Sequence, residues 1–466
     1  MSGCGGERPR PTVATVIQDD AELLHRSPRQ IAATLDELRT LGVDWVRVTA
    51  GWSVIAPEPR ALRSPAFDAT DPTKYPPYVW GKLDRVYEMA RRRAMKVAID
   101  IAFWAPRWAV GRAGRRQDRQ RDSIDPSAYA DFAEAVARRY PRAVAFTIWN
   151  EPNHPVFLLP QWKRSDGVWR PASPHAYRAL VQAAVPRIKA AVPNALVLIG
   201  ATSSVGSDTG NNSADRMAPL TFLREMACVD ERMRPLRVPE CARFASLPGD
   251  GWSHHPYSLE LTPSQRDPRA GNVRMGDLAR LTDLLGRLHA GGRTRNALTL
   301  YLTEAGYQTN PPDPTWRVSL DDQARWLPEA ERIARAQPRV RSVAQFLVRD
   351  LSVRDGPDAA TRWRDYQSGL FFADGRAKPA RAAFALGLVA RREGVGRVGF
   401  WGLVRAGDGH RDARVTIREP DGSWRTLADE QTGRDGTFEV SVDIDPSRTF
   451  RLESGGHAGP PLVGAR

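Results

Sequence analysis

The sequence is short of three features that would each have pointed to a class of protein. No apolar run approaches the length of a membrane-spanning helix, so no such helix is expected. The three cysteines and eight histidines form no recognisable set of metal ligands. A formal net charge of +14 is compatible with binding to nucleic acid, membranes or acidic polysaccharides, but no nucleic-acid-binding motif accompanies it.

The composition instead indicates a globular protein with more than one domain. Arginine carries most of the positive charge, and it is scattered along expected helices, as at 91–93 and 138–139, without interleaved aromatic residues. We therefore expect no nucleic-acid partner. The hydrophobic content of 41% is ample for a folded core, and 466 residues exceed what one core usually supports. One large domain and one small domain are expected.

Two buried strands each end in a glutamate. Residues 144–149 form an almost unbroken apolar run, which fits a strand covered on both faces, and Asn150 and Glu151 follow before Pro152. Residues 299–306 repeat this design with a terminal Glu304 and a glycine. A polar turn at the end of a strand is the simpler alternative for either motif alone. Two such motifs far apart in the sequence favour a pair of carboxylates with a chemical role.

Strand-like and helix-like segments alternate through most of the chain. This pattern predicts a (β/α)8 barrel over residues 12–390, preceded by a tail at 1–11. Residues 391–396 are expected to form a linker. Short strands separated by Asp-Gly turns then predict a small β-sandwich over 396–456, which we expect to pack on the barrel. The expected barrel strands lie at 12–17, 45–49, 96–101, 144–149, 196–200, 251–257, 299–304 and 342–348.

The sequences of the two glutamate motifs resemble those of glycoside hydrolase clan A, the retaining glycosidases built on a TIM barrel. The sequence Trp149-Asn150-Glu151-Pro152-Asn153 is most similar to family 39 and its uncharacterised cellulase-like relatives, with family 5 next. The resemblance implies that Glu151 is the acid/base and Glu304 the nucleophile. It also implies carboxyl groups about 5–5.5 Å apart, where an inverting enzyme has about 6.5–9.5 Å. No metal and no organic cofactor are expected.

The same resemblance suggests supporting roles for residues around the pair. Arg47, inside the second strand, matches an arginine that bonds near the nucleophile, although an exposed strand face is the alternative. Asn150 would hold the sugar 2-hydroxyl, while His255 and Tyr257 match positions at the end of the sixth strand. A metal site is one interpretation of the adjacent histidines at 254 and 255. Neighbouring side chains on a strand point to opposite faces, however, which favours a packed or hydrogen-bonded His254.

Aromatic residues near the strand ends are candidates for contacts with sugar rings. Trp104 follows the third strand and Trp149 ends the fourth, and packing of a loop on the barrel is the alternative explanation for each. Many clan A members have a tryptophan at the end of the eighth strand. Here the aromatic residue is Phe346, which departs from family 5 and leaves the floor of the subsite unassigned.

The cysteines give information on the cellular location of the protein. Cys228 and Cys241 lie close together in a polar loop and predict a disulfide, with two reduced thiols as the alternative. Cys4 lies in Ser-Gly-Cys, which resembles the end of a bacterial lipobox without its hydrophobic segment; a cytoplasmic start is the alternative. The cysteine pair and a polysaccharide-type site favour an extracellular or cell-surface location, with anchoring through a lipidated Cys4.

The sequence therefore predicts a monomeric retaining glycosidase that acts on an oligo- or polysaccharide. Two rival functions remain open: a non-catalytic carbohydrate-binding protein on the same barrel, and a TIM-barrel enzyme of other chemistry that uses the carboxylates as metal ligands or proton shuttles.

Overall fold

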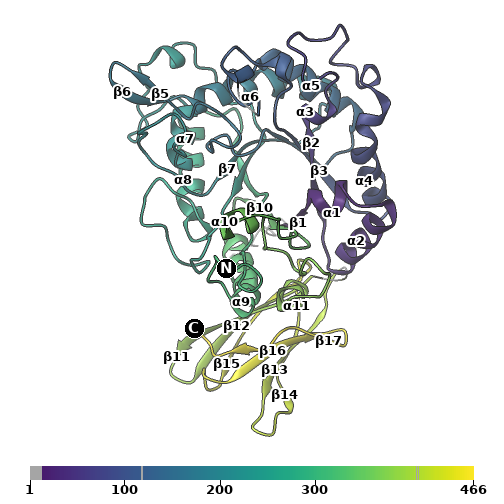
Figure 1. Ribbon diagram of the computed structural model, residues 1–466. Coiled ribbons are helices and arrows are strands. Elements are labelled where there is room, and N and C mark those ends of the chain that lie inside the picture. The colour runs from purple at the N-terminus through teal and green to yellow at the C-terminus, as the bar shows by residue number, and fades with distance from the viewer. Residues whose placement is uncertain (1–12, 117–118, 406, 408) are drawn as a thin grey trace, which may run out of the picture.

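The computed structural model describes residues 13–116, 119–405, 407 and 409–466. The expected tail at 1–11 and the lipidation site at Cys4 lie outside the described residues. Eight parallel strands close into a barrel in the order β1-β10-β9-β8-β7-β4-β3-β2 (Figure 1). The barrel strands are β1 (Ala14–Gln18), β2 (Trp45–Gly51), β3 (Lys96–Ala102), β4 (Ala145–Ile148), β7 (Val197–Ser203), β8 (Gly251–His255), β9 (Thr299–Leu302) and β10 (Val340–Phe346).

Helices lie between the barrel strands and form its outer ring (Figure 1). Several begin where the sequence carries a start signal: Ser27 caps α2 through a capping box, and Asp125 caps α5, each followed by proline. The helices are α1 (Asp20–Leu24), α2 (Pro28–Thr40), α3 (Trp52–Ile55), α4 (Gly81–Arg91), α5 (Pro126–Arg139), α6 (Ser173–Ala191), α7 (Pro219–Met226), α8 (Leu278–Ala290), α9 (Leu320–Arg335), α10 (Ala359–Arg362) and α11 (Pro379–Ala385).

The loops contain shorter secondary-structure elements. Strands β5 (Trp162–Ser165) and β6 (Val168–Pro171) form a separate hairpin after β4. The 3-10 helices are η1 (Pro72–Lys74), η2 (Pro77–Trp80), η3 (Arg107–Ala109), η4 (Gly114–Arg116), η5 (Pro239–Cys241) and η6 (Met275–Asp277). No helix within the described ranges is both long enough and apolar enough to cross a membrane.

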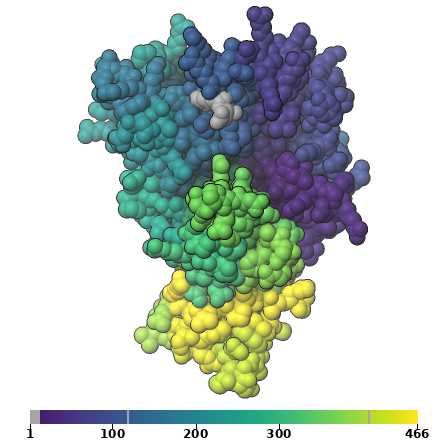
Figure 2. Space-filling model, in the orientation of Figure 1, coloured from purple at the N-terminus to yellow at the C-terminus, as the bar shows by residue number. Residues whose placement is uncertain are grey.

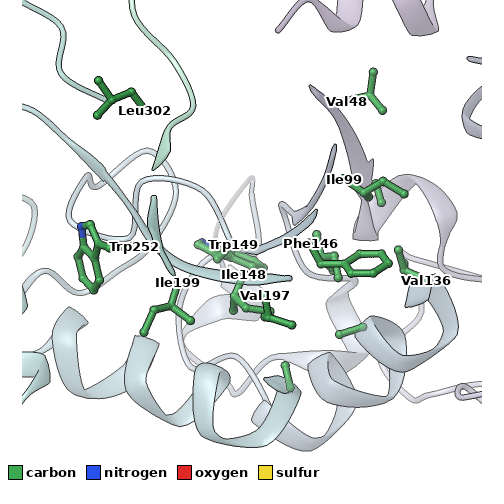
Figure 3. Packing of buried hydrophobic residues seen from close by; sticks show 14 of the residues in the cluster. Val48, Ile99, Val136, Phe146, Ile148, Trp149, Val197, Ile199, Trp252 and Leu302 are labelled. Carbon is green, nitrogen blue, oxygen red and sulfur yellow. The ribbon is translucent and has the colours of Figure 1, made fainter. Parts of the chain in front are cut away.

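The main core lies between the barrel strands and the surrounding helices. Figure 3 shows Phe146 and Ile148 of β4 among these side chains, with Val136 of α5 beside Phe146. Trp149 belongs to the same core and is fully buried. Burial of large apolar side chains contributes about 1.5–3 kcal/mol each. The strand that leads to Glu151 is therefore held firmly on its outer face.

The C-terminal part is a β-sandwich, as the sequence predicts. One sheet has the order β11-β12-β15 and the other β14-β13-β16-β17, with β18 also paired to β16. Apolar residues of both sheets form one core, including Phe400 and Phe450, whose ring centroids are 5.0 Å apart. The strands are β11 (Leu386–Gly394), β12 (Arg397–Val404), β13 (Asp412–Arg418), β14 (Trp424–Gln431), β15 (Thr437–Asp443), β16 (Thr449–Ser454), β17 (His457–Ala458) and β18 (Leu462–Val463).

The expected linker over 391–396 is wrong. Residues 391–394 belong to β11, which pairs with β12, and the turn between these strands holds Gly396 at a φ of 69°. The glycines mark a tight hairpin because such a φ suits glycine. The sandwich thus begins at Leu386, directly after α11, and its last strand ends at Val463.

The sandwich forms a separate lobe that packs against α9 and α11 (Figure 2). Arg405, just after β12, is the central contact. It bonds to both carboxylate oxygens of Glu331 on α9, to the carbonyl of Phe384 and to the hydroxyl of Thr15. Thr15 lies at the amino end of β1. The lobe therefore reaches the end of the barrel opposite to the carboxyl ends of its strands.

Candidate active site

Glu151 and Glu304 meet at the carboxyl end of the barrel. Glu151 follows β4 and Glu304 follows β9, and one carboxylate oxygen of each lies within 4.8 Å of the other and of a His255 ring nitrogen. His255 Nδ1 is 3.0 Å from Glu151 Oε1 and 3.6 Å from Glu304 Oε2. The two glutamates of the sequence motifs thus form one site, as predicted.

The backbone around Glu151 is fixed in an unusual conformation. Trp149 and Glu151 have backbone φ values of 60° and 37°, which residues other than glycine rarely adopt. The amide of Glu151 donates to the carbonyl of Ala201 on β7 at 2.9 Å. Trp149 is buried in the core and its indole Nε1 donates to the carbonyl of Phe157. The structure therefore places Trp149 as an anchor of this turn and not on an open sugar-binding surface.

Glu304 is held by two donors that approach different oxygens. Arg47 Nη1 donates to Oε1 at 2.7 Å, and the Tyr257 hydroxyl donates to Oε2 at 3.0 Å. The Glu304 side chain is 11% exposed, whereas that of Arg47 is 1% exposed. The carboxylate consequently has a fixed orientation and still opens towards solvent.

Arg47 is the centre of a buried polar network and does not lie on an exposed strand face. Its Nη2 lies 3.0 Å from Asp100 Oδ2 and donates to Asn150 Oδ1 at 3.2 Å, while its Nη1 also donates to Gln18. Burial raises the pKa of Asp100 to about 7, although the charge of Arg47 acts in the opposite direction. Sequence reasoning missed Asp100 and Gln18. The signal available was an acidic residue inside an apolar barrel strand.

His254 and His255 have different environments. His254 Nδ1 pairs with Thr202 Oγ1 at 2.9 Å, and its Nε2 pairs with the carbonyl of Val273 at 2.9 Å. Burial lowers the pKa of His254 to about 4, so this ring is neutral near pH 7. These contacts match the hydrogen-bonded His254 that the sequence favoured. His255 points into the site instead, beside both glutamates.

The charge state of Glu151 depends on His255. Burial alone would raise the pKa of Glu151, but the hydrogen bond with His255 and the nearby positive charge, including that of Arg216, outweigh burial and hold that pKa below its ordinary value. These contacts therefore favour the ionised form of Glu151.

A cleft lined by three aromatic side chains adjoins Glu151. It has a volume of about 640 Å³, including the space at its open mouth, and Figure 2 shows the hollow between the segment after β10 (green) and the loops after β3 and β4 (blue). Trp316 and Tyr366 line it, together with Tyr257 and the polar residues His154 and Arg216. Sequence reasoning did not single out Trp316 or Arg216, since their loops carry no local motif, and it passed over His154, which directly follows the motif of Glu151.

Trp104 and Phe346 are partly exposed, and each contacts neighbouring side chains. The guanidinium of Arg119 lies 4.1 Å from the Trp104 ring centroid, and the indole of Trp104 donates to the carbonyl of Val156. Phe346 makes edge contacts with Tyr257 and Tyr366, at centroid distances of 6.1 and 5.1 Å. Phe346 therefore supports the tyrosine that orients Glu304.

Two groups of potential metal ligands occur among the described residues. One contains His175, Cys228 and Cys241, but these two cysteines form the disulfide that the sequence predicted, so their sulfurs are not thiolates. The other contains Glu151, His255 and Glu304. There the Arg47 guanidinium and the Tyr257 hydroxyl already occupy the oxygens of Glu304, and the arginine charge opposes a cation.

Comparison with known proteins places this site in a family. The model of the cellulase family, glycosyl hydrolase family 5, matches residues 17–269, more than half of the 466 residues. The matched range includes Arg47, Glu151 and Tyr257. No curated protein sequence matches the chain significantly.

Solved structures of glycoside hydrolases align with this chain, one of them with a TM-score above 0.5. A family 39 glycoside hydrolase from the gut symbiont Bacteroides cellulosilyticus WH2 aligns with a TM-score of 0.54 at 13% identity, over 93% of this chain and 81% of its own. A subfamily 18 member of family 5 from Streptomyces cattleya, solved with GlcNAc, gives 0.49 at 16% identity, over 80% and 79%. A family 10 endoxylanase from a sugarcane soil metagenome gives 0.48 at 12% identity, over 80% and 96%.

The predicted resemblance to clan A is confirmed, and the matching model is that of family 5, which the sequence motif ranked after family 39. The protein is a glycosidase on a TIM barrel, and the chain belongs to the cellulase family, glycosyl hydrolase family 5.

Proposed function

We propose that this enzyme hydrolyses glycosides with retention of configuration, with Glu304 as the nucleophile and Glu151 as the acid/base. The observation that carries the proposal is the gap of at most 4.8 Å between their nearest carboxylate oxygens. Retaining glycosidases have carboxyl groups about 5–5.5 Å apart, whereas inverting enzymes need about 6.5–9.5 Å to fit a water. The narrow gap therefore favours direct attack by a carboxylate.

The contacts of Glu304 suit a nucleophile. Arg47 and Tyr257 hold its two oxygens from different sides, so the carboxylate is oriented before a sugar binds. In the first step Glu304 attacks the anomeric carbon, the bond from that carbon to the leaving oxygen breaks, and a glycosyl-enzyme forms. The second step transfers the sugar to water and releases the carboxylate.

The contacts of Glu151 suit an acid that later acts as a base. It must hold a proton to deliver to the leaving oxygen, and the hydrogen bond with His255 Nδ1 orients its carboxyl group for that transfer. Once Glu151 has lost its proton, the same carboxylate accepts a proton from the attacking water, and the lowered pKa of Glu151 favours this ionised form. His255 thus positions Glu151, and Glu151 transfers the proton.

Asn150 is placed to contact the sugar next to the reacting carbon. Its Oδ1 accepts from Arg47, which leaves the amide Nδ2 to donate to a sugar hydroxyl. A hydrogen bond to the 2-hydroxyl strengthens in the transition state of this reaction. We propose this role for Asn150, with an oligo- or polysaccharide as substrate.

We also propose that the enzyme works outside the cytoplasm, as a monomer. The Cys228–Cys241 disulfide supports this location, because such bonds persist in oxidising compartments. Anchoring through a lipidated Cys4 remains a prediction, which mass spectrometry of the N-terminal peptide from membrane fractions would test. An unmodified Cys4 would refute it. Light scattering of the purified protein would test the monomer.

Azide rescue assigns the two glutamates to their roles. Glu304→Ala removes the nucleophile, so azide attacks the anomeric carbon directly and gives a glycosyl azide of inverted configuration. Glu151→Ala keeps the nucleophile, so an activated aryl glycoside forms a glycosyl-enzyme that accumulates, and azide releases it with retention. A working aryl glycoside comes from a screen of a substrate panel.

The stereochemistry of the two azide products is the readout. If Glu304→Ala gave the retained azide and Glu151→Ala the inverted one, the roles would be exchanged. If both variants kept full turnover, neither glutamate would be catalytic. If the folded enzyme bound oligosaccharides but cleaved none, the rival of a non-catalytic binding protein would gain support.

A further inference from the structure

Arg216 is a cation in the cleft that forms no close ion pair with a carboxylate among the described residues, although its charge helps to lower the pKa of Glu151. It lines the same cavity as Glu151, and its side chain is exposed. The neighbouring Asp215 is not its counter-ion, because that carboxylate accepts from the amides of Asn211 and Asn212. Arg47, the buried cation of the site, is by contrast ion-paired with Asp100 and Glu304. The charge of Arg216 is therefore available to a ligand.

The backbone that carries Arg216 is fixed relative to Glu151. Asn153, two residues after Glu151, accepts from the amide of Ser203 and donates to the carbonyls of Ser203 and Met217. The amide of Met217 donates back to the carbonyl of Asn153 at 3.0 Å. Gly206 lets the two arms of this loop approach closely, since a Cβ there would lie 2.2 Å from the Met217 carbonyl carbon. Arg216 is thus part of the rigid frame of the acid/base.

His154 supplies a neutral donor beside this cation. The amide of Val156 donates to His154 Nδ1 at 3.1 Å, so the proton of the neutral ring is on Nε2. Burial lowers the pKa of His154 to about 4, and the ring is neutral near pH 7. A guanidinium with a neutral N–H donor is a suitable set for an oxyanion, because charge-assisted hydrogen bonds to such groups are short and strong.

Glu151, which protonates the leaving oxygen in the proposed mechanism, lines the cavity, and so does Tyr257, which bonds to Glu304. Trp316 and Tyr366 line the same cavity and can stack on a sugar ring. We infer that the sugar on the leaving-group side is seated beside Glu151 in this cavity, with its substituents within reach of Arg216.

We propose that the substrate is an acidic glycan and that Arg216 binds a carboxylate or sulfate on the sugar of the leaving-group side. This inference rests on the proposed function and adds the substrate class. A neutral glycan offers Arg216 no counter-ion. An acidic glycan supplies one, which the guanidinium binds through charge-assisted hydrogen bonds.

Binding to an inactive enzyme tests this independently of the catalytic roles. In the Glu304→Gln variant, calorimetry would measure oligosaccharides containing glucuronate, galacturonate or mannuronate, each beside the same oligosaccharide after reduction of its carboxylates to alcohols. Sulfated oligosaccharides and their desulfated forms would distinguish the two oxyanions. The added substitutions are Arg216→Gln, Arg216→Lys and, as a matched control in the distant sandwich, Arg418→Gln.

We expect at least one acidic oligosaccharide to bind about tenfold or more tightly than its neutral form, and Arg216→Gln to remove that preference. Arg216→Lys should restore part of it, and Arg418→Gln should leave it unchanged. Equal binding of acidic and neutral forms, or binding of neutral oligosaccharides alone, would overturn the inference. So would a failure of every acidic oligosaccharide to bind.

Kinetics separate this role from an effect of Arg216 on Glu151. In the active enzyme, Arg216→Gln should lower kcat/KM for the acidic substrate by a larger factor than for the neutral one. If it lowered both by the same factor, Arg216 would act through the acid/base and the substrate class would be wrong. Both proposals would be supported if Glu304→Ala lost all turnover but still bound acidic oligosaccharides more tightly than their neutral forms.

Discussion

Two buried arginines, Arg47 in the barrel and Arg405 at the junction with the sandwich, show how one type of side chain serves two purposes. Each is paired with carboxylates, and each is almost inaccessible to solvent. The carboxylates of Arg47 include Glu304, which opens onto the cleft. Those of Arg405 belong to Glu331, which is sealed between the barrel and the sandwich.

The pairing around Arg405 is complete, whereas that around Arg47 is not. Burial would raise the pKa of Glu331, but the charges of Arg405 and Arg335 outweigh it and lower that pKa to about 2. Near Arg47, by contrast, His255 Nε2 and both oxygens of Asp100 lack a hydrogen-bond partner among the described residues. Asp100 Oδ2 has only its ion pair with Arg47. Such incomplete pairing is typical of functional sites, and complete pairing of structural ones.

The largest expected effect is a loss of activity on substitution of the carboxylates at the Arg47 site. Glu304→Gln should lower kcat/KM on an unactivated glycoside by about 10⁴-fold or more, and Glu151→Gln by about 10²–10⁴-fold. The free energy of unfolding should change little, because Arg47 keeps Asp100 as a counter-ion. Steady-state kinetics and urea unfolding of the same preparations would check this. Loss of stability in proportion to activity would contradict it.

The next largest effect is a loss of folding stability on substitution of Arg405 at the junction with the sandwich. Arg405→Met leaves Glu331 buried with only Arg335, and breaking a buried ion pair costs about 3–5 kcal/mol of unfolding free energy. Turnover per folded molecule should not change, since the sandwich does no chemistry in this account. The double variant Arg405→Met with Glu331→Met should recover part of the loss. A fall in kcat like that of Glu151→Gln would show that the junction takes part in catalysis.

The disulfide should contribute a somewhat smaller amount. Cys228 and Cys241 are 13 residues apart, and closing a loop of this size stabilises a fold by about 3 kcal/mol in the chain-entropy estimate. The double variant Cys228→Ser with Cys241→Ser should unfold at lower urea than the parent. A reductant should destabilise the parent and not the variant, with Cys4→Ser as the control for the third thiol. Equal sensitivity of both proteins to reductant would contradict the assignment.

The smallest effect is a shift in pH dependence. A general acid is lost as the pH rises through its pKa, so the basic limb of kcat/KM reports Glu151. Burial acts to raise this pKa and His255 acts to lower it, and the influence of His255 prevails. His255→Asn removes the lowering influence and should move the basic limb to higher pH. An unmoved or lowered limb would show that His255 does not set the charge of Glu151.

Local signals in the sequence were sufficient to predict part of this site. Glu151 and Glu304 each end an apolar strand, and the charge of Arg47 is conspicuous inside one, so the pair and its arginine were predictable. Cys228 and Cys241 were close enough in sequence to pair. Each of these predictions needed only the neighbouring residues and the position of strand ends in a barrel.

Other parts depended on contacts that the sequence does not encode locally. Arg216 lies in a long loop after β7, and its place beside Glu151 results from the hydrogen bonds of Asn153. Trp149 appeared to be a sugar-binding aromatic residue, but the turn after β4 directs it into the core. Gly394 and Gly396 suggested a linker, although glycines at a tight hairpin give the same pattern.

The anomeric configuration of the first product tests the central claim most directly. With the wild-type enzyme and a substrate of known configuration, NMR spectra taken before mutarotation would show which anomer is released first. The narrow gap between Glu151 and Glu304 predicts the anomer with the configuration of the substrate. First release of the opposite anomer would contradict the double displacement and the role of Glu304 as the nucleophile.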